Sequence, residues 1–143
     1  MNQIYLAGPI SGLTLEQVTT WRTAAKNLLS DFEVLDPARD IETLVSTDGT
    51  FSPNFDESHA LADRDFDEVR SCDAVLANLL EAEHVSIGTC FELAWAYALK
   101  IPTFVVLPKD GGPHNHTFIR HFSVAVFSLE DAAKLLRILA SCW

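Results

Sequence analysis

The sequence has few cysteines and no long apolar run, and both absences restrict where the protein works. Its cysteines, Cys72, Cys90 and Cys142, are an odd number and follow no metal-ligand spacing. We therefore expect reduced thiols in a cytoplasmic protein. No stretch reaches the roughly 18 apolar residues of a transmembrane helix, and the N-terminus lacks the basic and apolar regions of a signal peptide. We expect no membrane partner.

Basic residues are also scarce. Lys and Arg number 10 against 20 Asp and Glu, a formal net charge of −10. No basic stripe is present to contact a phosphate backbone, so a nucleic acid polymer is not expected as a partner. A small anionic substrate stays possible, because backbone N–H groups at the start of a helix bind phosphate without any net positive charge. Solubility alone also accounts for the acidity.

Familiar cofactor and nucleophile motifs are missing. Residues 8–12 follow an apolar run but lack the Gly-x-Gly-x-x-Gly order, and the chain has neither a P-loop nor a Gly-x-Ser-x-Gly elbow. His114, His116 and His121 lie close together without a cysteine or a placed carboxylate, which is a weak pattern for zinc. No metal site is expected.

Short apolar runs alternate with helical periodicity along the chain. Ser86 has the character of an N-cap, and Thr14 with Gln17 resembles a capping box. Gly49 and Pro53 lie in a polar stretch that indicates a mobile surface loop within residues 40–58. The predicted strands are 4–7, 32–35, 74–78, 103–107 and 124–127, and the predicted helices are 14–30, 59–70, 87–99 and one from the Ser128 cap to residue 139.

This order predicts one α/β domain over residues 1–143, a flavodoxin-like doubly wound sandwich. Its five-stranded, mainly parallel sheet would carry helices on both faces. Ligands of such sheets bind beyond the carboxyl ends of the strands. That rule selects residues 8–12, 36–39, 78–86 and 107–116 as the candidate region.

Glu92 is the leading candidate for chemistry. It lies in a predicted helix among apolar or small neighbours. A buried carboxylate must be hydrogen-bonded or have a shifted pKa. Gly88, one turn earlier, would leave the face above Glu92 open for a ligand. The alternative is a partly exposed glutamate on a helix flank.

Two further candidates have plain structural alternatives. Tyr5 ends an apolar run before a Gly-Pro turn, so its hydroxyl either reaches the ligand end of the sheet or is satisfied in the core. Asp63, Asp65 and Asp67 alternate faces on a helix, so at most one or two of them face one site. Three such residues form a solvated face more often than a site.

Three segments in combination resemble the nucleoside 2-deoxyribosyltransferase family. They are Ile4-Tyr5-Leu6-Ala7-Gly8-Pro9, Asp65 eight residues before Asp73, and Ser86-Ile87-Gly88-Thr89-x-x-Glu92-Leu93-x-x-Ala96. The resemblance covers nearly the whole chain and implies a flavodoxin-like fold without a cofactor. It also implies a homodimer or larger homo-oligomer whose subunits share active sites.

The resemblance implies roles for individual residues. Glu92 matches the nucleophile that attacks the anomeric carbon, and Tyr5 matches the tyrosine that orients it. Asp65 matches the aspartate that contacts the substrate and helps protonate the departing base. Gly8 and Pro9 match the first substrate-binding loop, and Gly88 the start of the nucleophile's helix.

One position departs from the nucleoside transferases, which carry an aspartate six residues before the nucleophile. Here that residue is Ser86, as in the related branch of nucleoside 5′-monophosphate N-glycosidases, where a serine contacts the phosphate. That branch has an arginine in the first loop, at about the position of Ser11. Asn115 and His116 resemble a late segment that reaches into a neighbouring subunit's site.

The function predicted is cleavage of the N-glycosidic bond of a 2′-deoxynucleoside or its 5′-monophosphate through a glycosyl-Glu92 intermediate, with transfer to another nucleobase. Hydrolysis of a nucleoside 5′-monophosphate is the main alternative. An NAD-cleaving enzyme and a nonenzymatic flavodoxin-like ligand-binding module are weaker ones. The expected partners are a small nucleoside or nucleotide and a nucleobase.

Overall fold

The computed structural model describes residues 2–46, 48–49, 51 and 54–142. Its strands are β1 (Gln3–Ala7), β2 (Glu33–Leu35), β3 (Ala74–Asn78), β4 (Thr103–Val106) and β5 (Val124–Val126). Its α-helices are α1 (Leu15–Leu28), α2 (Phe55–Ser71), α3 (Ile87–Ala98), α4 (Thr117–Phe122) and α5 (Leu129–Ser141). Two 3₁₀ helices, η1 (Ile41–Leu44) and η2 (Gly112–His114), lie in the connections.

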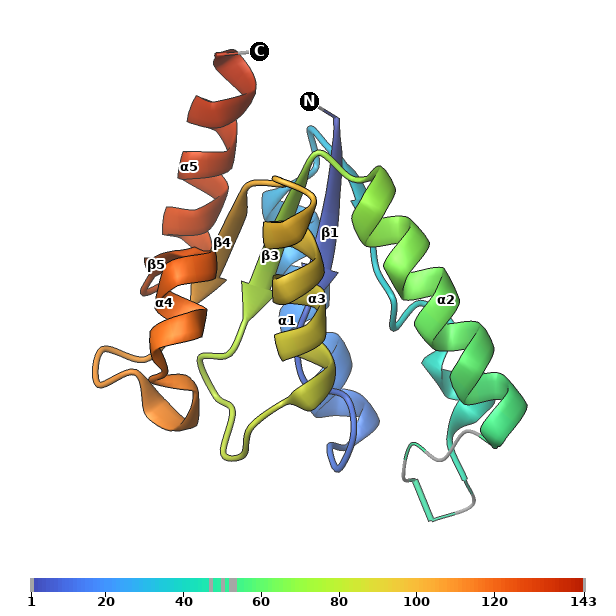
Figure 1. Cartoon of the computed structure of the whole chain (residues 1–143). Coiled ribbons are helices and arrows are strands. Elements are labelled where there is room, and N and C mark those ends of the chain that lie inside the picture. Colours follow the sequence, from blue (N-terminus) through green and yellow to red (C-terminus); the bar gives the residue numbers. More distant parts are fainter. Residues whose placement is uncertain (1, 47, 50, 52–53, 143) are drawn as a thin grey trace.

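The strands form one parallel sheet in the order β2-β1-β3-β4-β5. Its central strands β1, β3 and β4 are almost wholly buried, as expected for apolar strands covered on both sides. Figure 1 shows the helices on the two sides of this sheet. The flavodoxin-like, doubly wound prediction is confirmed, and the sheet is parallel throughout.

Alternate residues of each strand pack into two separate cores. Ile4 and Leu6 of β1 point to the side covered by α1 and α5, while Tyr5 and Ala7 point to the side covered by α2, α3 and α4. This two-residue alternation places the Tyr5 side chain on the same side of the sheet as α3.

The connection between β2 and α2 contains regular structure that was not predicted. Part of the predicted mobile loop lies outside the described residues, at positions 47, 50, 52 and 53. The rest forms η1 and an antiparallel bridge between Val45 and Phe51. Helix α2 begins at Phe55, four residues before the predicted 59, because the Asn54 side chain and Glu57 form a capping box. Helix α4 was not predicted.

The sheet reverses its winding between β1 and β3, where chain connections leave in opposite directions. The residues that follow these two strands, Gly8 and Leu79, therefore border a crevice at the carboxyl edge of the sheet. None of the helices in the described ranges is long and apolar enough to cross a membrane.

Candidate active site

A cavity of about 870 Å³ opens at this crevice. It is bounded by the β1–α1 loop, η1, one side of α2, the β3–α3 loop and the first turns of α3. Its volume is near the upper end of the roughly 300–1,000 Å³ typical of small-molecule sites. Glu92, Asp65, Ser86, Gly88, Gly8 and Pro9 all line it.

Glu92, in the wall of the cavity, is hydrogen-bonded to a buried residue from a distant part of the chain. The Tyr5 hydroxyl donates to Glu92 Oε1 at 2.6 Å, although the two residues are 87 positions apart. Tyr5 is fully buried and Glu92 is 8% exposed, so the carboxyl meets solvent only through the cavity. A solvated Glu92 does not fit this contact. Tyr5 is a core residue whose hydroxyl is satisfied by Glu92, and it reaches the cavity only through that carboxyl.

The surroundings of Glu92 disfavour its charged form. Burial raises the pKa of Glu92 to about 8, the Tyr5 hydrogen bond lowers it, and the charges of Asp65 and Arg22 act in opposite directions. The pKa of Tyr5 is raised well above its usual range, first by burial and then by the adjacent Glu92 charge. Tyr5 therefore stays protonated and serves as a hydrogen-bond donor.

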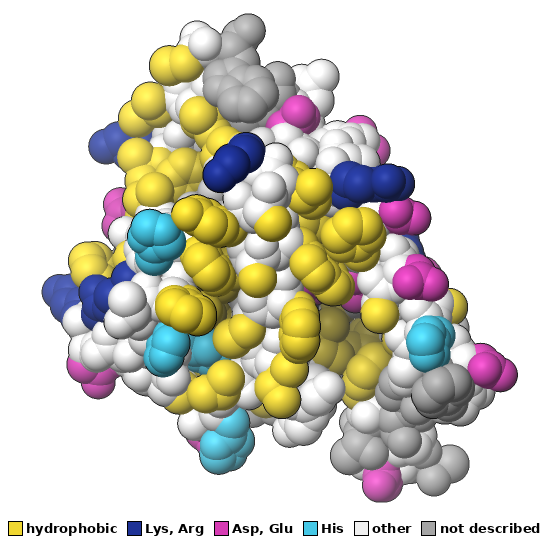
Figure 2. All heavy atoms as spheres, in the orientation of Figure 1, with side chains coloured by type: hydrophobic (Ala, Val, Ile, Leu, Met, Phe, Trp, Pro, Cys, Tyr) yellow, Lys and Arg dark blue, Asp and Glu magenta, His cyan; other side chains and the backbone are white. Residues whose placement is uncertain are grey.

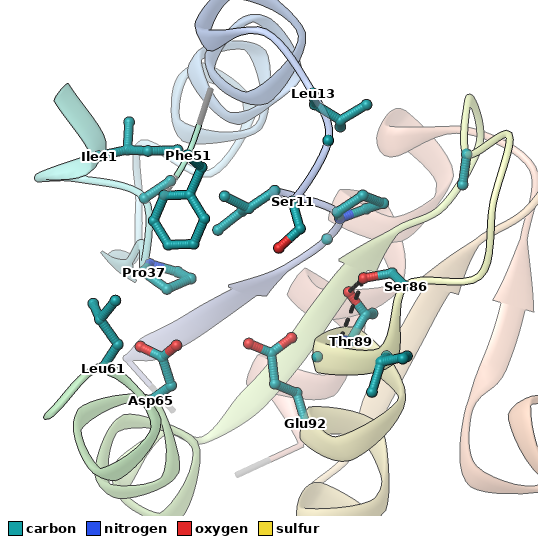
Figure 3. A pocket seen from close by; sticks show the side chains of 18 of the residues that line it. Ser11, Leu13, Pro37, Ile41, Phe51, Leu61, Asp65, Ser86, Thr89 and Glu92 are labelled. Atoms are coloured by element: carbon teal, nitrogen blue, oxygen red, sulfur yellow. Dashed lines mark hydrogen bonds between the residues drawn. The ribbon is translucent and has the colours of Figure 1, made fainter. Parts of the chain in front are cut away.

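Asp65 faces Glu92 from the opposite wall. Figure 3 shows the two carboxyl groups pointing toward one another across the cavity, from α2 and α3. Burial raises the pKa of Asp65, while Arg64, whose Nη2 lies 3.1 Å from Asp65 Oδ1, lowers it. Asp63 and Asp67 are exposed and do not line the cavity. Two carboxyls of raised pKa facing one space are suited to acid–base work.

The start of α3 gives the cavity a polar end. The Ser86 hydroxyl caps the helix by accepting from the Thr89 N–H, and the two hydroxyl oxygens lie 2.8 Å apart. Gly88 also lines the cavity, and a Cβ placed on it would meet no atom within 4 Å. The start of a helix with two hydroxyls nearby suits an oxygen-rich or anionic group.

The opposite end is apolar. Figure 3 shows Ile41, Phe51, Pro37 and Leu61 on the far side of the carboxyl pair from Ser86 and Thr89. Ile41 and Phe51 belong to a small apolar cluster built around Val18 and Ala38. The site thus has hydroxyl groups at one end, two carboxyl groups in the middle and an apolar wall at the other end.

The turn after β1 is held tightly. A Cβ on Gly8 would lie 2.6 Å from Trp21 Cζ2 and 3.1 Å from the Asn78 carbonyl oxygen, so only glycine fits there. The buried Arg22 guanidinium donates to the Gly8 carbonyl at 3.0 Å, and its Nε lies 3.2 Å from Asp36 Oδ1. The hydrogen bond to Gly8 holds α1 to the end of β1, and the ion pair with Asp36 holds it to the end of β2.

Asn115 and His116 are not brought into this cavity. The Asn115 amide contacts Arg120 and Asp110, and His116 caps α4 through Phe118 N–H. Their predicted role requires a second chain, and it stays a prediction. No cluster of three or more His, Cys, Asp or Glu that could hold a metal ion occurs within the described ranges.

Several site residues were not identified from the sequence. Thr89 belongs to a segment that resembles the family but has no role implied for it, and Arg22 falls within the predicted helix 14–30. Ile41 and Phe51 lie in the segment with no periodic pattern, so no sequence signal marked them. The rule that ligands bind beyond the carboxyl ends of the strands selected residues 36–39, which precede Ile41, but not Ile41 or Phe51 themselves.

Known proteins resemble this chain in both sequence pattern and fold. A family model described as nucleoside 2-deoxyribosyltransferase matches residues 4–132. A 2-deoxyribosyltransferase from the psychrotolerant bacterium Bacillus psychrosaccharolyticus has a similar structure, with a TM-score of 0.64 and 18% identity over 92% of this chain and 90% of that chain. A CMP N-glycosidase from Clostridium botulinum has a TM-score of 0.59 and 18% identity, over 96% and 99% of the two chains.

The same fold also occurs in a molybdenum cofactor binding protein from the phototrophic bacterium Rippkaea orientalis. Its TM-score is 0.63 at 14% identity, over 97% of both chains, so the fold alone does not fix an activity. A search of the curated proteins found no match. The family model, in contrast, spans most of the sequence. The chain therefore belongs to the nucleoside 2-deoxyribosyltransferase family.

Proposed function

We propose that the protein cleaves the N-glycosidic bond of a 2′-deoxynucleoside or its 5′-monophosphate, and that it transfers the sugar from Glu92 to a second nucleobase. The observation that carries this proposal is the 2.6 Å hydrogen bond from the Tyr5 hydroxyl to Glu92 Oε1, with Asp65 on the opposite wall of the same cavity. Membership of the family supports the class of reaction.

In the first step an oxygen of the ionised Glu92 carboxylate forms a bond to the anomeric carbon as the bond from that carbon to the base nitrogen breaks. The electron pair of the broken bond stays on the base, and the protonated Asp65 carboxyl supplies a proton to a base nitrogen. The raised pKa of Asp65 fits this role of general acid. A covalent glycosyl ester divides one difficult displacement into two easier ones.

In the second step an incoming base nitrogen attacks the anomeric carbon and the bond to Glu92 breaks. Asp65, now a carboxylate, takes the proton that the incoming base loses. Glu92 leaves as a carboxylate that the Tyr5 hydroxyl stabilises. Two inversions give net retention at the anomeric carbon.

The two ends of the cavity suggest how the substrate lies. The sugar would sit between Glu92 and Asp65, with its 5′ end toward the Ser86 and Thr89 hydroxyls. The base would then contact the apolar wall that includes Phe51 and Ile41. A planar, weakly hydrated base gains from burial against such a surface.

Hydrolysis of a 5′-monophosphate is the second candidate, because the polar end places a serine hydroxyl at the start of a helix. Electrostatics oppose it. Among the described residues that line the cavity, Arg64 is the one Lys or Arg. Its side chain already donates to the Pro37 carbonyl and pairs with Asp65. The carboxylates of Asp40, Glu81 and Glu83 line the same cavity and would repel a phosphate dianion.

We also infer self-association through the surface formed by α3 and α4, called here the α3–α4 face. Figure 2 shows hydrophobic side chains gathered over these helices, and Ile87, Phe91 and Phe118 are each more than half exposed. Glu92, which is buried, is the single charged residue of Ile87–Ala98. An apolar hollow of about 400 Å³ on this face shares Val85 and Phe91 with the cavity, so a second copy there would border the site.

The free thiols of Cys72, Cys90 and Cys142 fit a cytoplasmic location.

The test is a chromatographic time course with deoxynucleosides and their 5′-monophosphates, each with and without a second free base. We expect a new nucleoside only when the second base is present, and a mass increase of one deoxyribosyl group on the peptide that contains Glu92. Base release from monophosphates alone, unaffected by added base, would replace transfer by hydrolysis.

Two controls sharpen this experiment. Ser86→Asp should lower any preference for monophosphates over nucleosides, because the new charge repels phosphate. Incubation with NAD should release no nicotinamide. Release of nicotinamide, or the absence of turnover with the whole panel, would contradict the proposal.

A further inference from the structure

His114 is a buried histidine whose ring has one hydrogen-bond partner among the described residues. It ends η2, in the connection from β4 to α4, and is 2% exposed. Its Nε2 accepts a 2.9 Å hydrogen bond from the backbone N–H of Ser86. Its Nδ1 is buried and has no hydrogen-bond partner among the described atoms.

This contact fixes the form of the imidazole. Because Nε2 accepts a hydrogen bond, the proton of the neutral ring lies on Nδ1. Turning the ring over would place a carbon against the Ser86 N–H, so the orientation is determined. Burial lowers the pKa of His114, which favours the neutral ring. The unpaired Nδ1–H costs stability that a phenylalanine of similar shape would avoid.

The bond closes a loosely held loop between β3 and α3. The Leu79 N–H donates to the Val106 carbonyl, and the Ala82 N–H donates to the Leu79 carbonyl. Glu83, His84 and Val85 are exposed, and within the described ranges the next backbone N–H with a partner is that of Ser86. Residues 81–88 all line the cavity, so the position of this loop shapes the site.

The other bonds of Ser86 stay within α3. Its hydroxyl contacts Thr89, and its carbonyl accepts from the Cys90 N–H. His114 therefore supplies the hydrogen bond that ties this helix start to the connection after β4.

We propose that His114 is a positioning residue whose Nε2 holds Ser86, and with it the β3–α3 loop, at the polar end of the cavity. It lines the hollow of the α3–α4 face and not the cavity, so it acts through Ser86 without touching substrate. Its effect on turnover rests on the proposed function.

The first test needs no substrate. A long-range nitrogen–proton NMR correlation on the wild-type protein at neutral pH should assign His114 to the Nδ1–H tautomer. In hydrogen exchange the Ser86 amide should be protected. An Nε2–H tautomer, or a Ser86 amide that exchanges at the rate of an unstructured chain, would overturn the proposal.

The second test compares His114→Phe with His114→Gln, whose amide oxygen can take the place of Nε2. His114→Phe should speed exchange of the Ser86 amide about tenfold or more, the effect of losing one hydrogen bond. It should raise KM for nucleosides about tenfold and change kcat less than about threefold. His114→Gln should restore most of both losses.

Equal exchange and equal KM in wild type and His114→Phe would overturn the proposal. So would a His114→Gln variant no better than His114→Phe. If His114→Phe does not fold, the proposal is still tested by the tautomer of His114 in the wild-type protein and by the exchange rate of the Ser86 amide in His114→Gln. Failure of the wild-type protein to cleave any nucleoside would overturn the proposed function alone, because tautomer and exchange rate do not depend on turnover.

Discussion

At the scale of single residues, Glu92 combines an expected catalytic use with a stability cost. Its folded pKa of about 8 lies above the ordinary glutamate value of 4.5, mainly because the group is buried. A raised carboxyl pKa means that the fold loses stability as pH rises from about 4.5 through about 8.

Glu92→Gln should separate these two properties. We expect turnover to fall by more than about a thousandfold, because an amide cannot form the glycosyl ester. A rise from 4.5 to about 8 corresponds to about 5 kcal/mol, so at pH 9 the variant should be more stable than wild type by up to about that amount, and at pH 4.5 the difference should vanish. Thermal unfolding at both pH values measures this. A stability difference independent of pH would contradict the assigned pKa.

Tyr5→Phe tests the hydrogen bond that lowers the Glu92 pKa. Without the hydroxyl, the Glu92 pKa should rise above about 8, and the acidic limb of kcat/KM should move to higher pH by the same amount. At pH 7 the variant should lose about tenfold in kcat/KM for each unit of that shift. Profiles between pH 6 and 10 measure it.

The chain offers a matched control in its other tyrosine. Tyr97 is exposed, and its hydroxyl lies 3.0 Å from His121 Nε2, away from the cavity. Tyr97→Phe should leave the pH profile unchanged. An identical shift in both variants would mean that the Tyr5 bond does not control Glu92.

The residues differ in how far the sequence alone could reveal them. Glu92 was identifiable because a carboxylate among apolar helical neighbours conflicts with its surroundings. The same reasoning could not find His114, since its partner is 28 residues earlier and a histidine in a polar loop conflicts with nothing. Contacts between distant loops follow from the fold and not from local pattern.

At the scale of elements, α3 serves as both core helix and cavity wall. Leu93 and Ala96 are buried in the core under the sheet, while Gly88 and Glu92 face the cavity. Glycine inside a helix is unfavourable compared with alanine, so Gly88 lowers the stability of the first turns.

Gly88→Ala should therefore make the protein more stable and less able to bind substrate. We expect a gain of about 0.5–1 kcal/mol in the free energy of unfolding, since the added methyl meets no atom within 4 Å. KM should rise because the methyl occupies space in the cavity. Thermal unfolding and steady-state kinetics measure the two effects, and a less stable variant would show that the turn is strained.

Most of the predicted elements were accurate. All five strands and helices α1, α3 and α5 lie within two residues of their predicted bounds. The predicted start of α2 is four residues too late, because the capping box that begins at Asn54 follows directly on the turn residues Gly49 and Pro53. Helix α4 spans only Thr117–Phe122, too short to show a period.

At the scale of the whole molecule, net charge and the α3–α4 face act against each other. Each chain carries a formal charge of −10, so two copies repel one another at low ionic strength. Salt screens this repulsion but leaves apolar burial in place. Self-association should therefore strengthen as sodium chloride rises from about 20 mM to about 200 mM.

Sedimentation velocity over a range of protein concentrations measures this dependence. Phe118→Asp should weaken association by about tenfold or more, because Phe118 lines the hollow and is 62% exposed. Phe127→Asp is the matched control, since Phe127 is 53% exposed and lies outside the hollow. Equal effects of the two substitutions would place the contact elsewhere.

The strand order has a consequence for the growing chain on the ribosome. Strand β1 is made first but lies inside the sheet, and the register pairs Ile4 with Ala74. A nascent chain that ends before β3 can pair β1 only with β2, so one edge of an apolar strand stays open to chaperones and to other chains. Tyr5 acquires its carboxylate partner later still, when Glu92 has been made. The Tyr5–Glu92 pair thus forms late in translation, and under the proposed function an incomplete chain has no nucleophile to present to a nucleoside.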